Sequence, residues 1–134
     1  MPKNVAGVLA ASILAGLFGF ACWVWMRPAL NPSIEEGRAV ADAFLTGVRD
    51  GKTGDVWATT TPEFKSAEGR ERFITRLKKN AWVRETMVYS SAQHVNVNGN
   101  ERIEFVFTSD KSGKPVRLLV GRDQRQWKVD RLSF

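Results

Sequence analysis

The sequence predicts an α+β fold: an N-terminal transmembrane helix, then two main helices packed on a four-stranded antiparallel sheet in a cone-like domain. Three observations lead to this prediction. Residues 5–26 carry no charge, residues 33–80 place apolar side chains at helical spacing, and residues 82–134 alternate apolar and polar side chains. A sheet with one apolar face needs a cover, and the two helices before it supply that cover.

Residues 5–26 predict a membrane anchor. A helix of this length spans about 33 Å, which matches a hydrocarbon core of about 30 Å. Trp23 and Trp25 stand near its end, where interfacial tryptophans are favoured. The run is longer than the apolar segment of a cleaved signal peptide. Cleavage before Cys22, as in a lipoprotein, is disfavoured because Gly19 stands where leucine is usual.

The charges beside the anchor favour a single-pass protein of the cell membrane with a cytoplasmic N-terminus and an extracytoplasmic domain. Lys3 and the terminal amine slightly outweigh Arg27 under the positive-inside rule. Residues 27–32 form a linker of at most about 20 Å, which holds the domain, residues 33–134, close to the bilayer. Small residues at every fourth anchor position permit a homodimer. An ordinary alanine- and glycine-rich span is the favoured interpretation of Ala11, Ala15 and Gly19.

Two amphipathic helices and a short helical piece are predicted before the sheet. The first helix covers about residues 33–49, starts with a Ser-x-x-Glu capping box and stops at Asp50-Gly51. The short piece opens at Gly54-Asp55, and Thr61-Pro62 breaks it. The second long helix covers about residues 67–80. Apolar residues at helical spacing give both long helices a core face: Val40, Ala41, Phe44, Leu45 and Val48, then Phe73, Ile74, Leu77 and Ala81.

The first of three predicted hairpins turns at Asn98-Gly99. A two-residue loop would set Val95 opposite the charged Arg102. We expect a three-residue loop over residues 98–100, because a register slip of one residue moves a whole apolar face into water. The pairs that this loop predicts are Val95 with Ile103 and Gln93 with Phe105.

The other two hairpins agree on one apolar face. The segment Asp110-Lys111-Ser112-Gly113 is typical of a type I turn, and the last turn centres on Asp123-Gln124. The expected pairs are Phe107 with Val116, Phe105 with Leu118, Ile103 with Val120, Val120 with Trp127 and Leu118 with Val129.

The last strand leaves two arrangements open. Strict alternation would aim Arg131 at the apolar face and Leu132 and Phe134 at water. In the favoured arrangement, a bulge near Asp130 shifts the phase, turns Leu132 and Phe134 inward and turns Arg131 outward. Otherwise Arg131 lies inside the cone and needs an anionic partner, which would be an acidic ligand, Glu85 or Asp42.

Three segments carry a resemblance to a known family. Ala-Val-Ala-Asp-Ala-Phe-Leu-Thr-Gly-Val-Arg-Asp-Gly at 39–51 precedes Thr-Pro-Glu-Phe at 61–64, and the sheet ends with Gln-Trp-Lys-Val-Asp-Arg-Leu at 126–132. The chain thus resembles the nuclear transport factor two-like, or cystatin-like, superfamily of cone-shaped α+β domains, and its small membrane-anchored bacterial members in particular. The resemblance covers residues 33–134 and implies the fold. That superfamily includes ketosteroid isomerase, dehydratases, immunity proteins and secretion-system scaffolds, so fold alone assigns no function.

The residue patterns predict neither catalysis nor a cofactor nor a metal site. His94 is the single histidine, and the expected register places it on the wet face opposite Glu104. A general base needs a pocket around it, and the acidic residues do not cluster at metal-ligand spacing. The polar residues expected on the inner face of the cone are the candidates for a pocket: Tyr89, Ser91, Gln93 and Arg131.

The formal net charge of +6 is too diffuse to indicate a nucleic acid partner. Basic residues do crowd into residues 70–84, where Arg72, Arg76 and Lys79 share one helix face. Anionic lipid headgroups are a candidate partner, because each basic residue near such a surface gains about 1 kcal/mol. The favoured alternative is a solvated face supported by a Glu68–Arg72 pair at i,i+4.

These observations favour a membrane-anchored, extracytoplasmic interaction or accessory module without catalysis, with an unidentified protein partner at the membrane. Two alternatives stay open. One is a small-ligand binding or isomerase- or dehydratase-like domain that uses the cone as a pocket, and the other is a scaffold subunit of a secretion-type membrane complex. An open cone with convergent polar groups favours the ligand-binding domain. A plugged cone favours the module, and the expected plugs are Trp57, Phe64, Trp82 and Trp127.

We expect the full-length chain to remain in membranes through a carbonate wash, because residues 5–26 are long enough to span a bilayer. Fractionation and immunoblotting measure this retention. As a control, deletion of residues 5–26 should move the domain to the soluble fraction. Recovery of a shortened soluble form of the unaltered chain would show that the segment is cleaved.

Overall fold

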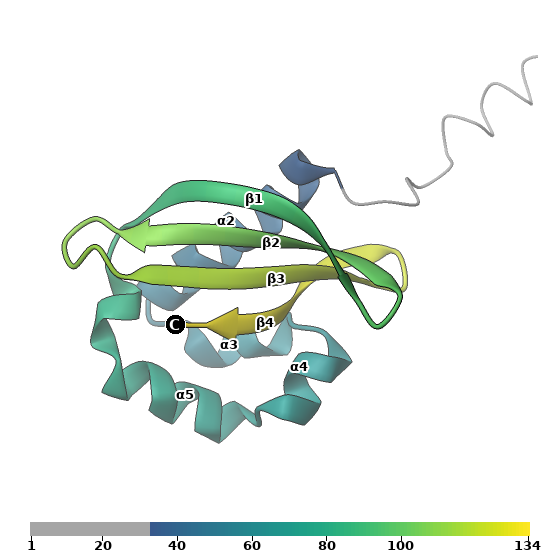
Figure 1. Ribbon diagram of the computed structural model, residues 1–134. Coiled ribbons are helices and arrows are strands. Elements are labelled where there is room, and N and C mark those ends of the chain that lie inside the picture. Colours follow the sequence, from purple (N-terminus) through teal and green to yellow (C-terminus); the bar gives the residue numbers. More distant parts are fainter. Residues whose placement is uncertain (1–32) are drawn as a thin grey trace, which may run out of the picture. The chain divides into compact units, whose positions relative to one another are not determined.

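The computed structural model describes residues 33–134, in which helical segments precede four strands (Figure 1). The predicted anchor, residues 5–26, lies outside the described residues, and within residues 33–134 no helix is long and apolar enough to cross a bilayer. The elements are α2 (Ile34–Arg49), α3 (Thr53–Ala58), α4 (Pro62–Ala67), α5 (Arg70–Lys79), the 3-10 helix η1 (Ala81–Arg84), β1 (Met87–Val97), β2 (Asn100–Ser109), β3 (Pro115–Asp123) and β4 (Gln126–Ser133).

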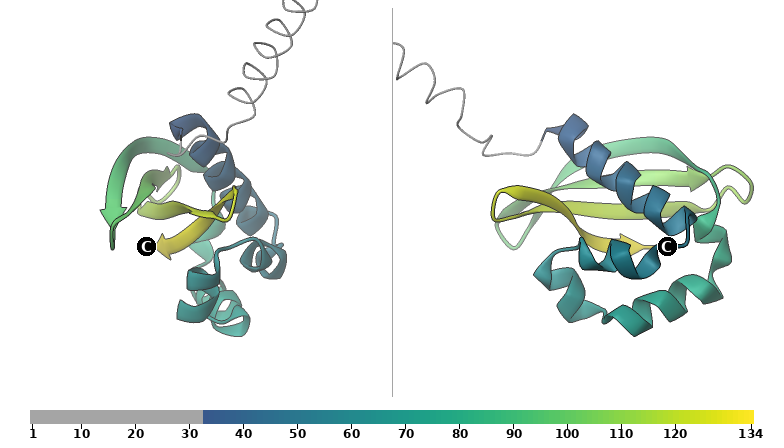
Figure 2. Two further views of the ribbon diagram at one scale, coloured as in Figure 1. Left: turned by 90° about the vertical axis from the view of Figure 1, so that its right-hand side faces the viewer. Right: turned by 180° about the vertical axis from the view of Figure 1, so that it is seen from behind.

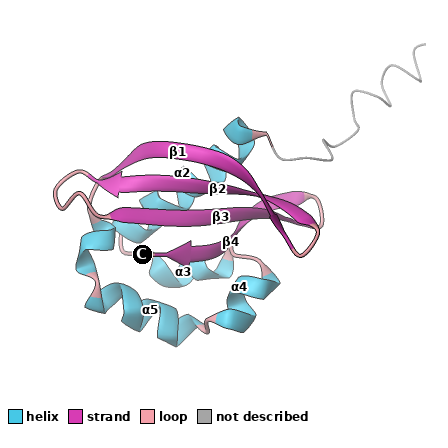
Figure 3. Cartoon of the chain, viewed as in Figure 1, coloured by secondary structure: helices cyan, strands magenta, loops and turns pink. Residues whose placement is uncertain are grey.

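The strands form one antiparallel sheet in the order β1-β2-β3-β4. Figure 2 shows α2 crossing one face of this sheet, and Figure 3 shows α3, α4 and α5 following one another past the β4 edge. The predicted α+β class with helices on a four-stranded antiparallel sheet is therefore confirmed for the described residues.

Helix α2 begins and ends where the sequence predicts. The hydroxyl of Ser33 accepts a hydrogen bond from the backbone N–H of Glu36 (3.2 Å), which satisfies one free donor of the first turn. Gly51 follows the helix with a φ of +80°, a conformation that glycine adopts without strain. The face toward the sheet is buried and consists of Ala41, Phe44, Leu45 and Val48.

The second predicted helix is shorter than expected. The chain forms a separate helix, α4, whose first residue is proline and whose N-cap Thr61 accepts from the N–H of Phe64 (3.2 Å). Glu68 then leaves the helical conformation, with φ −140° and ψ 111°, so α5 begins at Arg70 instead of Ala67. The indole N–H of Trp57 donates to the Glu68 carbonyl (2.9 Å) and stabilises this break.

The predicted three-residue loop of the first hairpin is wrong. Asn98 and Gly99 both have positive φ values, 52° and 81°, and form a two-residue turn that pairs Val97 with Asn100. Such a turn matches the right-handed twist of the flanking strands. The pairs that replace the predicted ones are Val95 with Arg102, Gln93 with Glu104 and His94 with Ile103.

A bulge in β1 makes this register compatible with the core. The pairing shifts between Tyr89 and Ser91, so that Tyr89 lies opposite the buried Phe107 while Ala92 lies opposite Phe105. The bulge therefore reverses the phase of the strand at Ser90, the fourth of its 11 residues. It keeps Tyr89 on the inner face in spite of the two-residue turn.

The second hairpin has the predicted pairs Phe107 with Val116, Phe105 with Leu118 and Ile103 with Val120. The third turn lies one residue further along than expected, at Gln124-Arg125. The predicted pairs Val120 with Trp127 and Leu118 with Val129 are therefore wrong, and the observed ones are Val120 with Val129 and Leu118 with Leu132. The partner of Val120 moves by two residues, from Trp127 to Val129. Because side chains alternate with a period of two, Trp127 and Val129 keep the face that the sequence predicts for them.

The predicted bulge near Asp130 is confirmed. The pairing between β3 and β4 shifts between Leu119 and Val120, which leaves Asp130 as the additional residue. Leu132 is consequently only 5% exposed, whereas Arg131 is exposed on the opposite face. The alternative in which Arg131 points into the cone is therefore wrong. Phe134, which was also expected to be buried, is 38% exposed, because it follows the last residue of β4.

The core lies between the inner face of the sheet and the helices. Phe44, Phe64 and Phe73 meet at its centre, with ring centroids 5.5 to 6.3 Å apart and the rings inclined to one another. The other buried core residues are Ala41, Leu45, Val48, Val56, Leu77, Val83, Ile103, Phe105, Phe107, Val116, Leu118, Val120, Val129 and Leu132.

We expect Leu132→Ala to lower the free energy of unfolding of the fragment 30–134 by about 2–5 kcal/mol, because it truncates a buried side chain. The neighbouring change Arg131→Met should alter it by no more than about 0.5 kcal/mol, as at other exposed positions. Urea unfolding followed by tryptophan fluorescence gives both values. Equal costs at the two positions would contradict the phase set by the bulge.

Candidate functional site

The four residues predicted to line a pocket do not come together. Tyr89 lies on the inner face, where its ring packs on Phe107 and the guanidinium carbon of Arg38 lies 4.0 Å from its centroid. Ser91 and Gln93 lie on the opposite face, beyond the bulge, and Arg131 is exposed on β4. Because β1 and β4 are the two edges of the sheet, these side chains line no common cavity.

Aromatic side chains contribute to the packing between the sheet and the helices. Phe64 is 3% exposed, and Trp57, Trp82 and Trp127 are half-buried against the core cluster. The indole N–H of Trp127 donates to a carboxylate oxygen of Glu36 (2.8 Å), which closes the sheet against the first turn of α2. Of the residues expected as plugs, Phe64 thus belongs to the buried core, while the three tryptophans pack against that core with part of their surface exposed.

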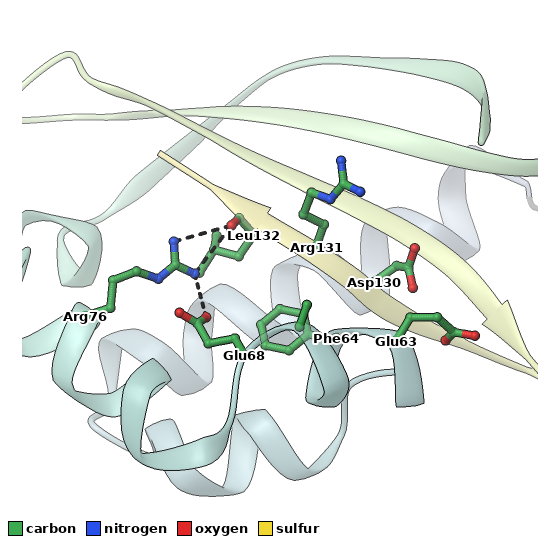
Figure 4. A pocket seen from close by; sticks show the side chains of 8 residues that line it. Glu63, Phe64, Glu68, Arg76, Asp130, Arg131 and Leu132 are labelled. Atoms are coloured by element: carbon green, nitrogen blue, oxygen red, sulfur yellow. Dashed lines mark hydrogen bonds and ion pairs between the residues drawn. The ribbon is translucent and has the colours of Figure 1, made fainter. Parts of the chain in front are cut away.

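The structure instead contains a hollow of about 290 Å³ between β4 and the helices α4 and α5 (Figure 4). Figure 4 shows the side chains of Arg76 and Glu68 pointing toward each other and Arg131 turned away from them. The residues that line the hollow are Glu63, Phe64, Ala67, Glu68, Arg76, Asp130, Arg131 and Leu132.

Ion pairs and hydrogen bonds already engage most charged groups of this hollow. Nη2 of Arg76 lies 2.8 Å from Glu68 and also donates to the Leu132 carbonyl (3.4 Å). Asp130 accepts from the hydroxyl of Thr61 (2.7 Å) and lies 3.6 Å from Nε of Arg102. The bulge aims Asp130 at α4, and these pairs hold α4 and α5 against β4.

A second hollow of about 290 Å³ lies where α2 and α3 meet β4. Its wall is mostly apolar, and Lys52, Asp55 and Thr59 contribute the polar groups. The remaining lining residues are Val40, Ala43, Phe44, Gly47, Val56, Trp127 and Val129.

His94 does not have the partner expected from the sequence. It pairs with the buried Ile103 instead of Glu104, so its register position is on the inner face of the sheet and the predicted wet face is wrong. Its Nδ1 lies 2.9 Å from a carboxylate oxygen of Glu101. The side chain is 46% exposed, so the geometry is that of a surface ion pair when the imidazole is protonated. Among residues 33–134, no three His, Cys, Asp or Glu side chains are placed to hold a metal ion.

The predicted basic face on α5 is only partly available. Arg76 is held by Glu68 and Leu132, so the expected pair of Glu68 with Arg72 is replaced by Glu68 with Arg76. Arg72 and Lys79 are exposed. Together with Arg76 they line a shallow hollow of about 390 Å³ on this face.

Sequence reasoning missed a hydrogen-bonded carboxylate at the start of β1. The hydroxyl of the buried Ser109 donates to Glu85, and the N–H of Ser112 donates to the Ser109 hydroxyl (3.1 Å). The Ser109 hydrogen bond lowers the pKa of Glu85, with further contributions from Ser112 and the charge of Lys111, while burial acts in the opposite direction. The signal in the sequence was Glu85 just before the first predicted strand and Ser109 at the end of the second.

The chain matches no protein-family model, and no curated protein matches its sequence. The resemblance to the nuclear transport factor two-like superfamily therefore stays a prediction. Residues 33–134 form an α+β domain with a four-stranded antiparallel sheet.

We expect Glu85 to contribute stability above its unfolded pKa and to lose that contribution as the pH falls through its lower folded pKa. Glu85→Gln should therefore flatten the acid limb of stability against pH, below about pH 5. Urea midpoints measured across this range test it. The control Glu71→Gln, at an 86% exposed carboxylate, should keep the slope of the unaltered protein. Identical slopes in all three proteins would contradict the assignment.

Proposed function

We propose that the protein is a membrane-anchored, extracytoplasmic interaction or accessory module without catalysis. Residues 5–26 would hold it in the bilayer, and residues 33–134 would present a rigid surface to a protein partner. The anchor and its orientation rest on the uncharged run and its flanking charges.

The observation that carries the proposal is the filled inner face of the sheet. Ile103, Phe105 and Leu118 are fully buried there beneath the helices. The two hollows of about 290 Å³ lie beside β4, at one edge of the sheet, and leave this face filled. Recognition on the outer surface is therefore the function that the packing supports best.

A small-ligand binding module is the second candidate, because the hollow beside β4 brings charged groups of both signs together. Binding there would have to displace either Glu68 from Arg76 or Thr61 from Asp130. Breaking such part-buried pairs costs free energy that a small ligand would have to recover. A scaffold subunit of a secretion-type complex is a special case of the interaction module.

Two measurements test the proposal: the side of the membrane on which the domain lies, and the protein that the domain contacts. Alkaline phosphatase fused after Phe134 should be active, and green fluorescent protein at the same place should stay dark, because the domain lies outside the cytoplasm. Crosslinking in intact membranes followed by mass spectrometry should then return the same protein partner from independent preparations.

The control is a chain whose residues 5–26 are replaced by an unrelated anchor, which should keep the partner because the domain supplies the contact. A fluorescent cytoplasmic fusion would contradict the location. Crosslinks that disappear with the anchor exchange would contradict the role of the domain.

A further inference from the structure

One end of the domain carries two aromatic side chains with a cation beside each. The ring of Phe134 packs edge-on against Trp82, with 5.6 Å between centroids. The guanidinium carbon of Arg76 lies 4.7 Å from the Phe134 centroid, and Nζ of Lys114 lies 5.2 Å from that of Trp82. These four residues come from α5, η1, the turn before β3 and the end of β4, so only the fold brings them together (Figure 1).

This cluster is accessible and continues into a hollow. Phe134 is 38% exposed, Trp82 is half-buried and Lys114 is exposed. Arg76 belongs both to the aromatic cluster and to the wall of the 390 Å³ hollow on α5, where Lys79 lies beside it. We call this continuous area the basic aromatic surface and define it by Arg76, Lys79, Trp82, Lys114 and Phe134.

The excess positive charge of the domain is concentrated in the segments that carry this surface. Residues 33–134 contain 18 basic and 14 acidic side chains, a net charge of +4. The segments 68–85 and 110–114 contain eight of those basic side chains and four of the acidic ones, which leaves ten of each elsewhere. Among the four carboxylates, Glu68 is paired with Arg76, Glu71 lines the hollow and Glu85 is hydrogen-bonded to Ser109. The basic residues are Arg70, Arg72, Arg76, Lys78, Lys79, Arg84, Lys111 and Lys114.

We propose that the basic aromatic surface docks an acidic segment of a partner protein, one that carries an aromatic side chain among its carboxylates. Tryptophan and arginine are the residue types that contribute most to protein interfaces. The aromatic pair supplies apolar area, and the surrounding cations attract and orient carboxylates. This proposal rests on the proposed function and names the surface and the chemistry of its partner.

The test uses full-length protein in phosphatidylcholine nanodiscs and a fluorescein-labelled peptide of three Glu-Glu-Phe repeats. Fluorescence anisotropy should show saturable binding. The double variant Lys79→Glu, Lys114→Glu should raise the Kd at least about tenfold, because it reverses two exposed charges at the surface. The matched control Lys52→Glu, Arg125→Glu changes the net charge equally and should raise it less than about twofold. Thermal unfolding checks that both variants are folded.

Three results would overturn the proposal: no saturable binding, an equal loss in both double variants, or equal binding of a Lys-Lys-Phe peptide. Nanodiscs that contain phosphatidylglycerol test whether anionic lipid headgroups occupy the same surface. Peptide affinity that falls in these discs only when Lys79 and Lys114 are intact would assign the surface to anionic headgroups. Both faces of a nanodisc are open to the peptide, so peptide binding does not depend on which side of the membrane the domain occupies. The reporter fusions test that location separately.

Discussion

The apolar part of the inner face of the sheet must be covered, and the rest of the domain follows from this constraint. Helix α2 approaches β2 so closely that a Cβ at Gly37 would lie 3.0 Å from the ring of Phe105. The two bulges keep apolar side chains on that face. The bulge at Asp130 does more, because its carboxylate accepts from Thr61 and so ties the start of α4 to the sheet. One local irregularity thus sets both the phase of β4 and the position of a helix.

Local signals predicted most of this fold. Ser33 and Gly51 mark the ends of α2, and the inverted alternation at Arg131 and Leu132 predicts the second bulge. The first bulge, in β1, leaves no such signal, because the apolar residues before and after it alternate as they would in a regular strand. A regular β1 would require a three-residue turn at residues 98–100, which is why that turn was predicted. The break at Glu68 is also hidden, since the helical spacing of apolar residues continues through it and a contact from a distant indole stabilises it.

The candidate site was harder to predict because it depends on which face each residue occupies. A one-residue error in the first hairpin moved Ser91 and Gln93 from one face to the other. The pairing of Trp82 with Phe134 joins positions far apart in the chain, and no spacing rule relates them. The sequence does show that basic residues are clustered on α5. That Lys114 and the rings of Trp82 and Phe134 lie beside them is evident only from the fold.

The central proposal is that a domain with a filled core recognises its partner through the basic aromatic surface. Fluorescent labels at Ser112→Cys, in the turn before β3, and at Arg125→Cys, in the turn before β4, each in a Cys22→Ala background, measure this with a nitroxide-labelled peptide of Glu-Glu-Phe repeats. The account predicts stronger quenching at position 112 than at position 125. Equal quenching at the two positions, or stronger quenching at position 125, would contradict it.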